Sequence, residues 1–173
     1  MSKFTVRLLE EEDIQKISHY WLNSSKEHLI GMGVNLSKLP NESEFKFMLM
    51  DQLQMPLGNK RALATIWELN GEAIGHCNVN KISFGNEAYI HVHIWDKKHR
   101  KSGIGEELFK VSVDLFMEQL QLKRIICEPY AENAAPNNLL RNTSFQLIKT
   151  YSTIPGAINF EQMVNRWEYC RKN

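Results

Sequence analysis

The sequence predicts an α/β fold: a mixed, mostly antiparallel sheet that is flanked by helices and contains one parallel strand–helix–strand core. Three features lead to this fold class. Residues 87–95 alternate between apolar and polar side chains, which is the period of a strand. A basic turn with glycines follows, and apolar residues then recur at helical spacing over 104–115. Short strand-like segments separated by turn residues lie on both sides of this unit.

Length and composition are those of one ordinary globular domain. The chain has 173 residues, of which 43% are hydrophobic and 24% charged, so we expect a single domain over residues 1–173. A net charge of +1 argues against a nucleic-acid role driven by bulk electrostatics. No apolar run has the length of a membrane span, and no signal peptide is evident. The three cysteines show no Cys-x-x-Cys spacing, so we expect free thiols and a cytoplasmic protein.

The N-terminal third predicts one strand and two helices. Residues 4–9 alternate as a strand, and the acidic residues 11–13 then offer the start of a helix. Residues 23–40 predict a long irregular loop, and loops of that length in a compact domain are often binding elements. Asn41, with Glu44 three residues later, predicts the cap of a second helix.

Three antiparallel strands are expected before the basic turn. The Asn70–Gly71 pair joins two strand-like runs, residues 61–69 and 72–79. Both residues of such a pair tolerate the positive φ of a tight hairpin turn, so this is a strong hairpin signal. Residues 81–86 then turn the chain again, into the strand over 87–95.

The C-terminal part predicts three strands and one short helix. Residues 124–127 form a strand that should be parallel to the one before the helix, through a right-handed crossover. Pro136 is tolerated in a first helical turn, so a helix is expected over 135–142. Further strands are expected over 145–151 and 158–169. The last one, as an exposed edge, could pair with a second copy, so we expect a monomer or a homodimer.

One face of the strand over 87–95 is chemically rich. The core face carries Ala88, Ile90, Val92 and Ile94. The opposite face, here called the polar face, carries Glu87, Tyr89, His91, His93 and Trp95. An imidazole titrates near neutral pH, so both histidines are candidate general bases. Either could also be simply a hydrogen-bonded buried residue.

The turn after this strand concentrates the positive charge of the chain. It reads Lys97-Lys98-His99-Arg100-Lys101 and then Ser102-Gly103-Ile104-Gly105. The first amides of a helix lack internal partners and its dipole favours negative charge, so this turn suits a phosphate or pyrophosphate. A solvated connection is the plain alternative. The dinucleotide fingerprint is absent, because Leu108 stands where its third glycine would be, and no Gly-Lys-Ser/Thr follows.

Two motifs resemble those of the GNAT N-acetyltransferase superfamily. The stretch Arg100 to Gly105 is similar to the family's Arg/Gln-x-x-Gly-x-Gly/Ala signature. A second motif, Asn-x-x-Ala/Ser-x-x-x-Tyr/Leu-x-x-x-Gly-Phe, is matched in spacing by Asn133, Pro136, Leu140, Ser144 and Phe145. Pro136 and Ser144 depart from the family pattern. Leu140 replaces the tyrosine of many members, which resembles the branch that acetylates N-terminal amines of ribosomal proteins. The expected order of elements is also that of this family.

The resemblance implies a single GNAT domain that uses acetyl-CoA as a co-substrate, without a metal. The pyrophosphate would lie on the amides of 100–106. The pantetheine arm would follow the backbone over 93–95, where this strand parts from 124–127. The implied cofactor-binding residues are His93, Ile94, Trp95, Arg100, Lys101, Ser102, Gly103, Ile104, Gly105, Glu106, Asn133 and Asn138.

The implied reaction is direct attack of a primary amine on the thioester, in a ternary complex. The implied partners are thus acetyl-CoA and an amine, from a small molecule or a protein N-terminus, with no nucleic acid or membrane. Residues 23–40 and 152–157 would contact the amine. Some arylalkylamine-acetylating members also carry a His-x-His pair on this strand. The candidate catalytic residues are His91 and His93 as bases, Glu87 and Glu128 as second choices, and Tyr130 as an acid.

Two other functions compete with this one. A GNAT-like module could bind an acyl-CoA without turning it over, which the leucine at 140 would also fit. A metal-dependent hydrolase could instead use the histidine pair, with His76, Cys77 or Glu87 as a further ligand, although no ligand spacing supports a closed site. Cys127 is expected to be an inert buried thiol rather than an acetylated nucleophile.

Overall fold

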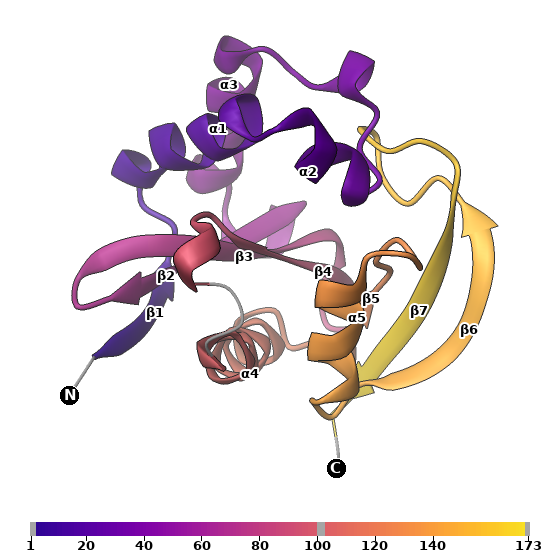
Figure 1. The fold of residues 1–173 in the computed structure, drawn as a ribbon. Helices are drawn as coiled ribbons and strands as arrows, with labels where there is room; N and C mark the ends of the chain where they lie inside the picture. Colours follow the sequence, from indigo (N-terminus) through magenta and orange to yellow (C-terminus); the bar gives the residue numbers. More distant parts are fainter. Residues whose placement is uncertain (1–2, 100–102, 172–173) are drawn as a thin grey trace.

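The molecule is built on one sheet of seven strands, in the order β1-β2-β3-β4-β5-β7-β6 (Figure 1). The computed structural model describes residues 3–99 and 103–171. The strands are β1 (Phe4–Leu8), β2 (Ala62–Leu69), β3 (Glu72–Ser83), β4 (Glu87–Ile94), β5 (Arg124–Cys127), β6 (Gln146–Thr153) and β7 (Gln162–Cys170). Neighbouring strands are antiparallel except β4 and β5, which are parallel, as the crossover predicts.

Helices cover both faces of this sheet (Figure 1). One face carries α1 (Ile14–Asn23), α2 (Lys26–Gly31) and α3 (Glu42–Gln54), and the other carries α4 (Ile104–Gln119) and α5 (Ala134–Arg141). Short 3₁₀ turns precede or link them: η1 (Glu11–Asp13), η2 (Leu36–Lys38), η3 (Leu57–Asn59) and η4 (Lys97–His99). The main core lies between the sheet and α4, and the apolar face of β4 packs into it as predicted.

The pairing of β4 with β5 is short. It runs from Glu87, opposite Arg124, to Tyr89, opposite Ile126. β4 itself continues to Ile94, still paired on its other side with β3. Within the described part of the chain, the two parallel strands therefore part in the middle of the sheet, beside the N-terminal end of α4.

Local signals in the sequence predict several elements correctly. The side chains of Asn41 and Glu44 form a reciprocal capping box at the start of α3. Asn70 and Gly71 adopt positive φ values of 53° and 83° in the β2–β3 turn. Both observations confirm sequence predictions that rest on a few adjacent residues.

Two expectations are wrong. Residues 23–40 are not an irregular loop, because they contain α2 and η2. Each is begun by a short-range cap: the Ser25 side chain accepts from the amide of His28, and that of Asn35 accepts from the amide of Ser37. The final strand is not an edge either, because β7 lies between β5 and β6, and β6 is the outer strand.

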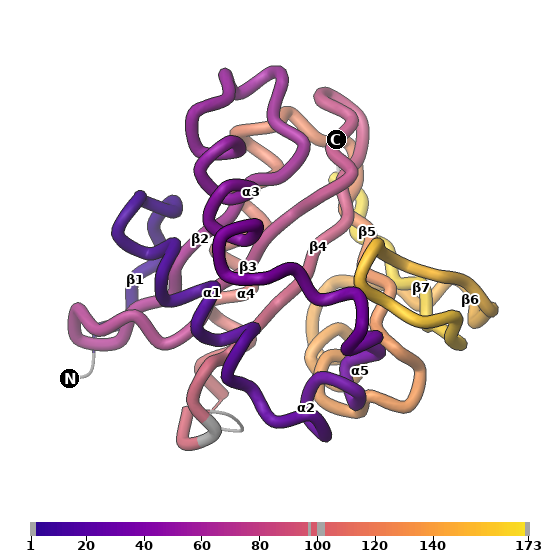
Figure 2. Tube along the Cα trace, turned by 90° about the horizontal axis from the view of Figure 1, so that it is seen from above, coloured from indigo at the N-terminus to yellow at the C-terminus, as the bar shows by residue number. Residues whose placement is uncertain are grey.

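The segment after α2 is fastened to the loop between β6 and β7. We call this contact the clasp, and it joins residues 33–35 to residues 158–162 (Figure 2). The amide of Asn35 donates to the carbonyl of Ile158 at 2.8 Å. The carbonyl of Gly33 accepts from Asn159 Nδ2 at 2.9 Å and from Gln162 Nε2 at 3.0 Å. The clasp therefore fastens one of the segments expected to contact a substrate, residues 23–40, to the residues that directly follow the other, 152–157.

Gly33→Ala should open the clasp and lower the free energy of unfolding by about 1–3 kcal/mol. Gly33 has a φ of +80°, and a Cβ there would lie 2.1 Å from Gln162 Oε1. Chemical denaturation measures the change. Gly31→Ala is the matched control, because no heavy atom lies within 4 Å of its added Cβ, and it should be neutral or stabilising by up to about 1 kcal/mol. Equal effects of the two substitutions would contradict the clasp.

Candidate active site

A thiol links β4 and β5 directly after their last paired residues. Cys127 Sγ, at the end of β5, donates to the carbonyl of Ile90 at 3.2 Å. Burial, followed by the negative charge of Glu128, raises the pKa of this thiol to about 12. The thiolate is the nucleophilic form of cysteine, so a thiol held protonated in this way makes an acetyl-cysteine intermediate unfavourable.

The polar face of β4 meets α1 and α2 in a cluster of aromatic rings. His93 lies opposite His76 of β3, and the two imidazoles stack with centroids 4.7 Å apart. Tyr20 of α1 places its hydroxyl 3.3 Å from His93 Nδ1 and 3.0 Å from Nε2 of His28, a residue of α2. Trp95 Nε1 donates to His76 Nδ1 at 2.7 Å.

The histidines of this region differ in basicity. Burial lowers the pKa of His76 to about 3, and the nearby His91 adds to the effect. Burial also lowers the pKa of His91 to about 4, with a further contribution from the positive charge of Lys81. His91 Nε2 lies 3.1 Å from Asn80 Oδ1. Both imidazoles are thus neutral and weakly basic at physiological pH.

A network of charged groups continues the polar face across β5 and β7. Glu128 Oε1 accepts from Tyr151 Oη and, at 2.9 Å, from Arg166 Nη1. The same guanidinium donates to Tyr89 Oη at 3.2 Å and to Glu168 Oε1 at 2.7 Å. The Glu128 carboxylate is nearly buried, and it is already bound by one cation and one phenol. Both of these contacts are made to the same oxygen, Oε1.

The other acidic candidate, Glu87, lies at the start of β4. Its carboxylate accepts from Arg124 Nε at 2.7 Å. Six positions separate it from His93 along the strand, so the structure does not bring the two together. Glu87 also does not form a metal site with the histidines. Within residues 3–99 and 103–171, no three His, Cys, Asp or Glu side chains converge as metal ligands would.

Residues after β5 return toward the sheet before α5. Tyr130 bridges Val164 of β7 through its backbone, and its hydroxyl donates to Glu132 Oε2 at 3.3 Å. Burial and the charge of Glu132 raise the pKa of this phenol. Asn133 occupies the N-cap position of α5, but its side chain forms no capping hydrogen bond. Asn138 is exposed and accepts from Arg141 Nη1 at 2.7 Å.

Asn137, which sequence analysis did not identify, holds this segment in place. Its buried amide donates to the carbonyls of Tyr130 and Asn133, at 3.1 and 2.8 Å. Its oxygen accepts from Trp167 Nε1 at 3.0 Å and from Asn165 Nδ2 at 2.9 Å. The only hint in the sequence is an asparagine on the core side of a short helix. Many helices have such a residue without this role.

The basic turn is described only at its two ends. Arg100, Lys101 and Ser102 lie outside the described residues. Before them, Lys98 Nζ pairs with Asp96 at 3.1 Å. After them, Gly103 adopts a left-handed conformation with φ 80° and is the N-cap of α4, so the helix begins at Ile104 as predicted. Gly105 and Glu106 follow in the first turn, and Glu106 Oε1 accepts from Asn142 Nδ2 at 2.8 Å.

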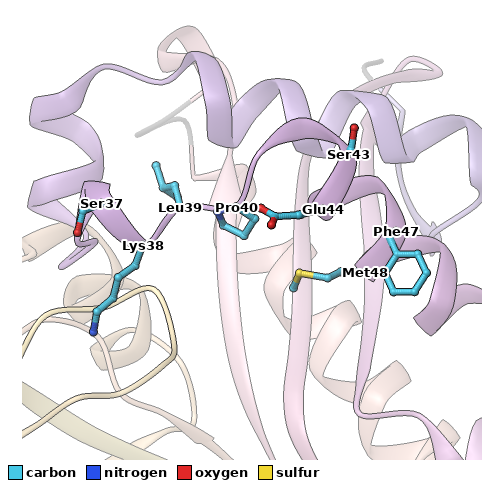
Figure 3. Close-up of a pocket in the computed structure, with 8 residues that line it drawn as sticks. All are labelled: Ser37, Lys38, Leu39, Pro40, Ser43, Glu44, Phe47 and Met48. Carbon is cyan, nitrogen blue, oxygen red and sulfur yellow. The ribbon is translucent and has the colours of Figure 1, made fainter.

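Two hollows open on the face of the sheet that carries α1, α2 and α3. One, of about 600 Å³, is lined by residues of α1, α2 and the strand ends, including Tyr20, His28 and Trp95. The other, of about 570 Å³, lies over η2 and α3 (Figure 3) and is lined by Ser37, Lys38, Leu39, Pro40, Ser43, Glu44, Phe47 and Met48. The second hollow contains none of the predicted catalytic or cofactor-binding residues that the structure describes, although residues 37–40 belong to the range expected to contact the amine. Among the described helices, none is both long and apolar enough to cross a membrane.

Solved structures share this fold at low sequence identity. The Salmonella typhimurium enzyme that modifies the N-terminal serine of ribosomal protein L7/L12 superposes with a TM-score of 0.77 and 15% identity, over 98% of this chain and 95% of its own. The ribosomal-protein-S5-alanine acetyltransferase of Vibrio fischeri gives 0.76 and 16%, over 98% and 96%. Spermidine N-acetyltransferase of Vibrio cholerae, solved with CoA and spermine, gives 0.76 and 18%, over 96% and 95%.

These likenesses confirm the predicted fold class. The sequence matches no curated protein. A family model for the acetyltransferase (GNAT) domain, however, matches residues 3–146, which is most of the chain. The match agrees with the two motifs and with the parting of β4 from β5, and it confirms the predicted class of enzyme. This chain therefore belongs to the GNAT acetyltransferase family.

Proposed function

We propose that the chain is one acetyltransferase domain over residues 1–173 that transfers the acetyl group of acetyl-CoA directly to a primary amine. The acceptor is a small molecule or a protein N-terminus, bound together with acetyl-CoA in a ternary complex. The parting of β4 and β5 beside the N-terminal end of α4 is the observation that carries this proposal.

The residues around this gap fit coenzyme A. An extended chain can add to a strand edge through backbone hydrogen bonds, and β4 continues to Ile94 after its pairing with β5 has stopped at Tyr89. The amides after Gly103 open α4 and suit a pyrophosphate. A structural neighbour was solved with CoA bound. We assign the cofactor to the residues that the family resemblance implies: 93–95, 100–106, Asn133 and Asn138.

His93 is the better of the two proposed bases. The amine must be neutral to attack, so a group on the enzyme has to accept a proton. His91 is a poor acceptor, because burial lowers its pKa to about 4. Glu128 is bound by Arg166 and Tyr151. His93 contacts Tyr20, whose hydroxyl offers an onward partner for the proton. Tyr130 keeps its phenolic proton at neutral pH and is the proposed donor to the leaving thiolate.

A non-catalytic acyl-CoA-binding module is the second candidate. Leu140 occupies the place of the tyrosine that many members use as an acid, and it is buried in the core. Because a leucine side chain has no dissociable proton, Leu140 cannot protonate the leaving thiolate. Release of free CoA in the presence of an amine separates the two candidates, because a binding module would release none.

The proposal includes a cytoplasmic location and a monomeric or homodimeric assembly. Cys77 and Cys127 are buried free thiols, which supports a reducing, cytoplasmic location. The outer strand β6 is mostly exposed along its length, so a homodimer could form through it, and a monomer is the alternative.

Calorimetric titration with acetyl-CoA should show saturable binding at one site. Dephospho-CoA, titrated alongside, tests whether the 3′-phosphate contributes. A screen of amines for release of free CoA should follow, with polyamines and peptide N-termini as the first acceptors. A well-folded protein that binds no acetyl-CoA would overturn the proposed function and would direct the work to zinc analysis of the histidine cluster.

His93→Ala should lower kcat by about 10²-fold or more, whereas His91→Ala should have a much smaller effect. A base must be unprotonated to act, so activity falls as pH drops through its pKa. An acid limb near pH 4 would identify His91 as the base, because burial lowers its pKa to about that value. Steady-state kinetics from pH 4.5 to 9 test this. His19→Ala, at an exposed residue that contacts Asn23, is the control. A larger loss for His91→Ala would reverse the assignment.

A further inference from the structure

Three side chains from three elements form a hydrogen-bonded line from the polar face to a hollow. The line runs from His93 of β4 through Tyr20 of α1 to His28 of α2. We propose that Tyr20 and His28 are positioning residues that relay a proton between His93 and solvent. The inference rests on the proposed function, with His93 as the base, and adds the path by which His93 exchanges its proton.

The geometry suits a relay because a hydroxyl has one proton and two lone pairs. Tyr20 is buried, and its hydroxyl lies 3.3 Å from His93 Nδ1 and 3.0 Å from His28 Nε2. To hold both rings, it must donate to one imidazole and accept from the other. Two orientations of the line are therefore possible, and a proton hop along it converts one into the other. Met32 Sδ, at 3.6 Å from the hydroxyl, is a weak acceptor that cannot pass a proton on.

The protons balance along the line. When the neutral amine forms its bond to the acetyl carbon, His93 Nε2 takes one proton from the amine nitrogen. The proton on His93 Nδ1 passes to Tyr20 Oη, the hydroxyl's own proton passes to His28 Nε2, and His28 Nδ1 releases one proton to water. When the carbon–sulfur bond breaks, the reverse hops let His93 Nε2 return a proton, directly or through Tyr130, to the leaving thiolate. No oxidant, reductant or further reactant is needed.

The neighbours of His93 favour transfer of the proton through Tyr20 toward the hollow rather than to His76. His76 stacks on His93, but burial lowers its pKa to about 3, and its Nδ1 already accepts from Trp95. It is therefore a poor proton acceptor. Tyr20 and His28 both line the hollow of about 600 Å³, which also contains Glu12, Lys16 and His19 as titratable groups. The line thus leads from the interior of the sheet to solvent.

The alternative is that Tyr20 only packs the helices on the sheet. Its ring also contacts Trp21, His28, His76 and His93 edge-on or tilted. Tyr20→Phe keeps the ring and removes only the hydroxyl, so it separates packing from proton transfer. Thermal unfolding of the variant checks that the packing survives.

Tyr20→Phe should lower kcat about tenfold or more while leaving the KM for acetyl-CoA within about twofold of its original value. Adding imidazole to the buffer should restore much of the lost rate, because a soluble base can take the place of the line. His28→Gln should change kcat in the same direction and should also respond to imidazole. A structural role predicts neither selective loss of kcat nor rescue.

Controls distinguish this inference from the proposed function. His19→Gln removes an imidazole from the same hollow, and Tyr169→Phe removes a hydroxyl from a partly buried ring that packs against the main core, so both should keep the original kcat. Imidazole ¹⁵N spectra give a readout without turnover: the His28 and His93 signals should both shift in Tyr20→Phe. If the unmodified enzyme acetylates an amine but Tyr20→Phe changes neither kcat nor these signals, the relay alone is overturned. If it binds acetyl-CoA and acetylates nothing, the proposed function falls, and the relay with it.

Discussion

The parting of β4 from β5 is the constraint on which the rest of this structure depends. Two parallel strands in the middle of a sheet normally satisfy each other's backbone groups along their whole length. Here β5 is four residues long and β4 eight, and only Glu87 to Tyr89 are paired across. Among the described residues, the unequal lengths leave the end of β4 without a strand partner on this side, while α4 lies on one face of the sheet and α1 to α3 lie on the other (Figure 1).

The groups that surround the gap are immobilised by partners that lie far away in the sequence. Asn137 fixes the segment from Tyr130 to Asn133 against β7. Arg166 holds the carboxylate of Glu128. Tyr20 reaches His93 across 73 positions of sequence. Fixed partners of this kind keep side chains in one geometry, so that reactants meet groups already in place.

These distances also explain what the sequence could and could not predict. The capping box at Asn41, the turn at Asn70–Gly71 and the alternation of β4 depend on residues within a few positions of one another, and each was predicted correctly. The position of β7 between β5 and β6, and the contact of Tyr20 with His93, depend on the tertiary fold, for which the sequence has no local pattern. The low pKa of His91 likewise arises from burial in the tertiary fold, which the order of residues along a strand does not reveal.

The clasp couples the segment after α2 to the loop between β6 and β7. The carbonyl of Gly33 accepts from two side chains and from the amide of Phe160, and the amide of Asn35 donates to Ile158, so adjacent residues join the segment after α2 to the β6–β7 loop. Moving either segment alone would break these hydrogen bonds, whereas moving both together would keep them. We therefore expect the two segments to move together, so that an acceptor approaching this side of the sheet meets them as one unit.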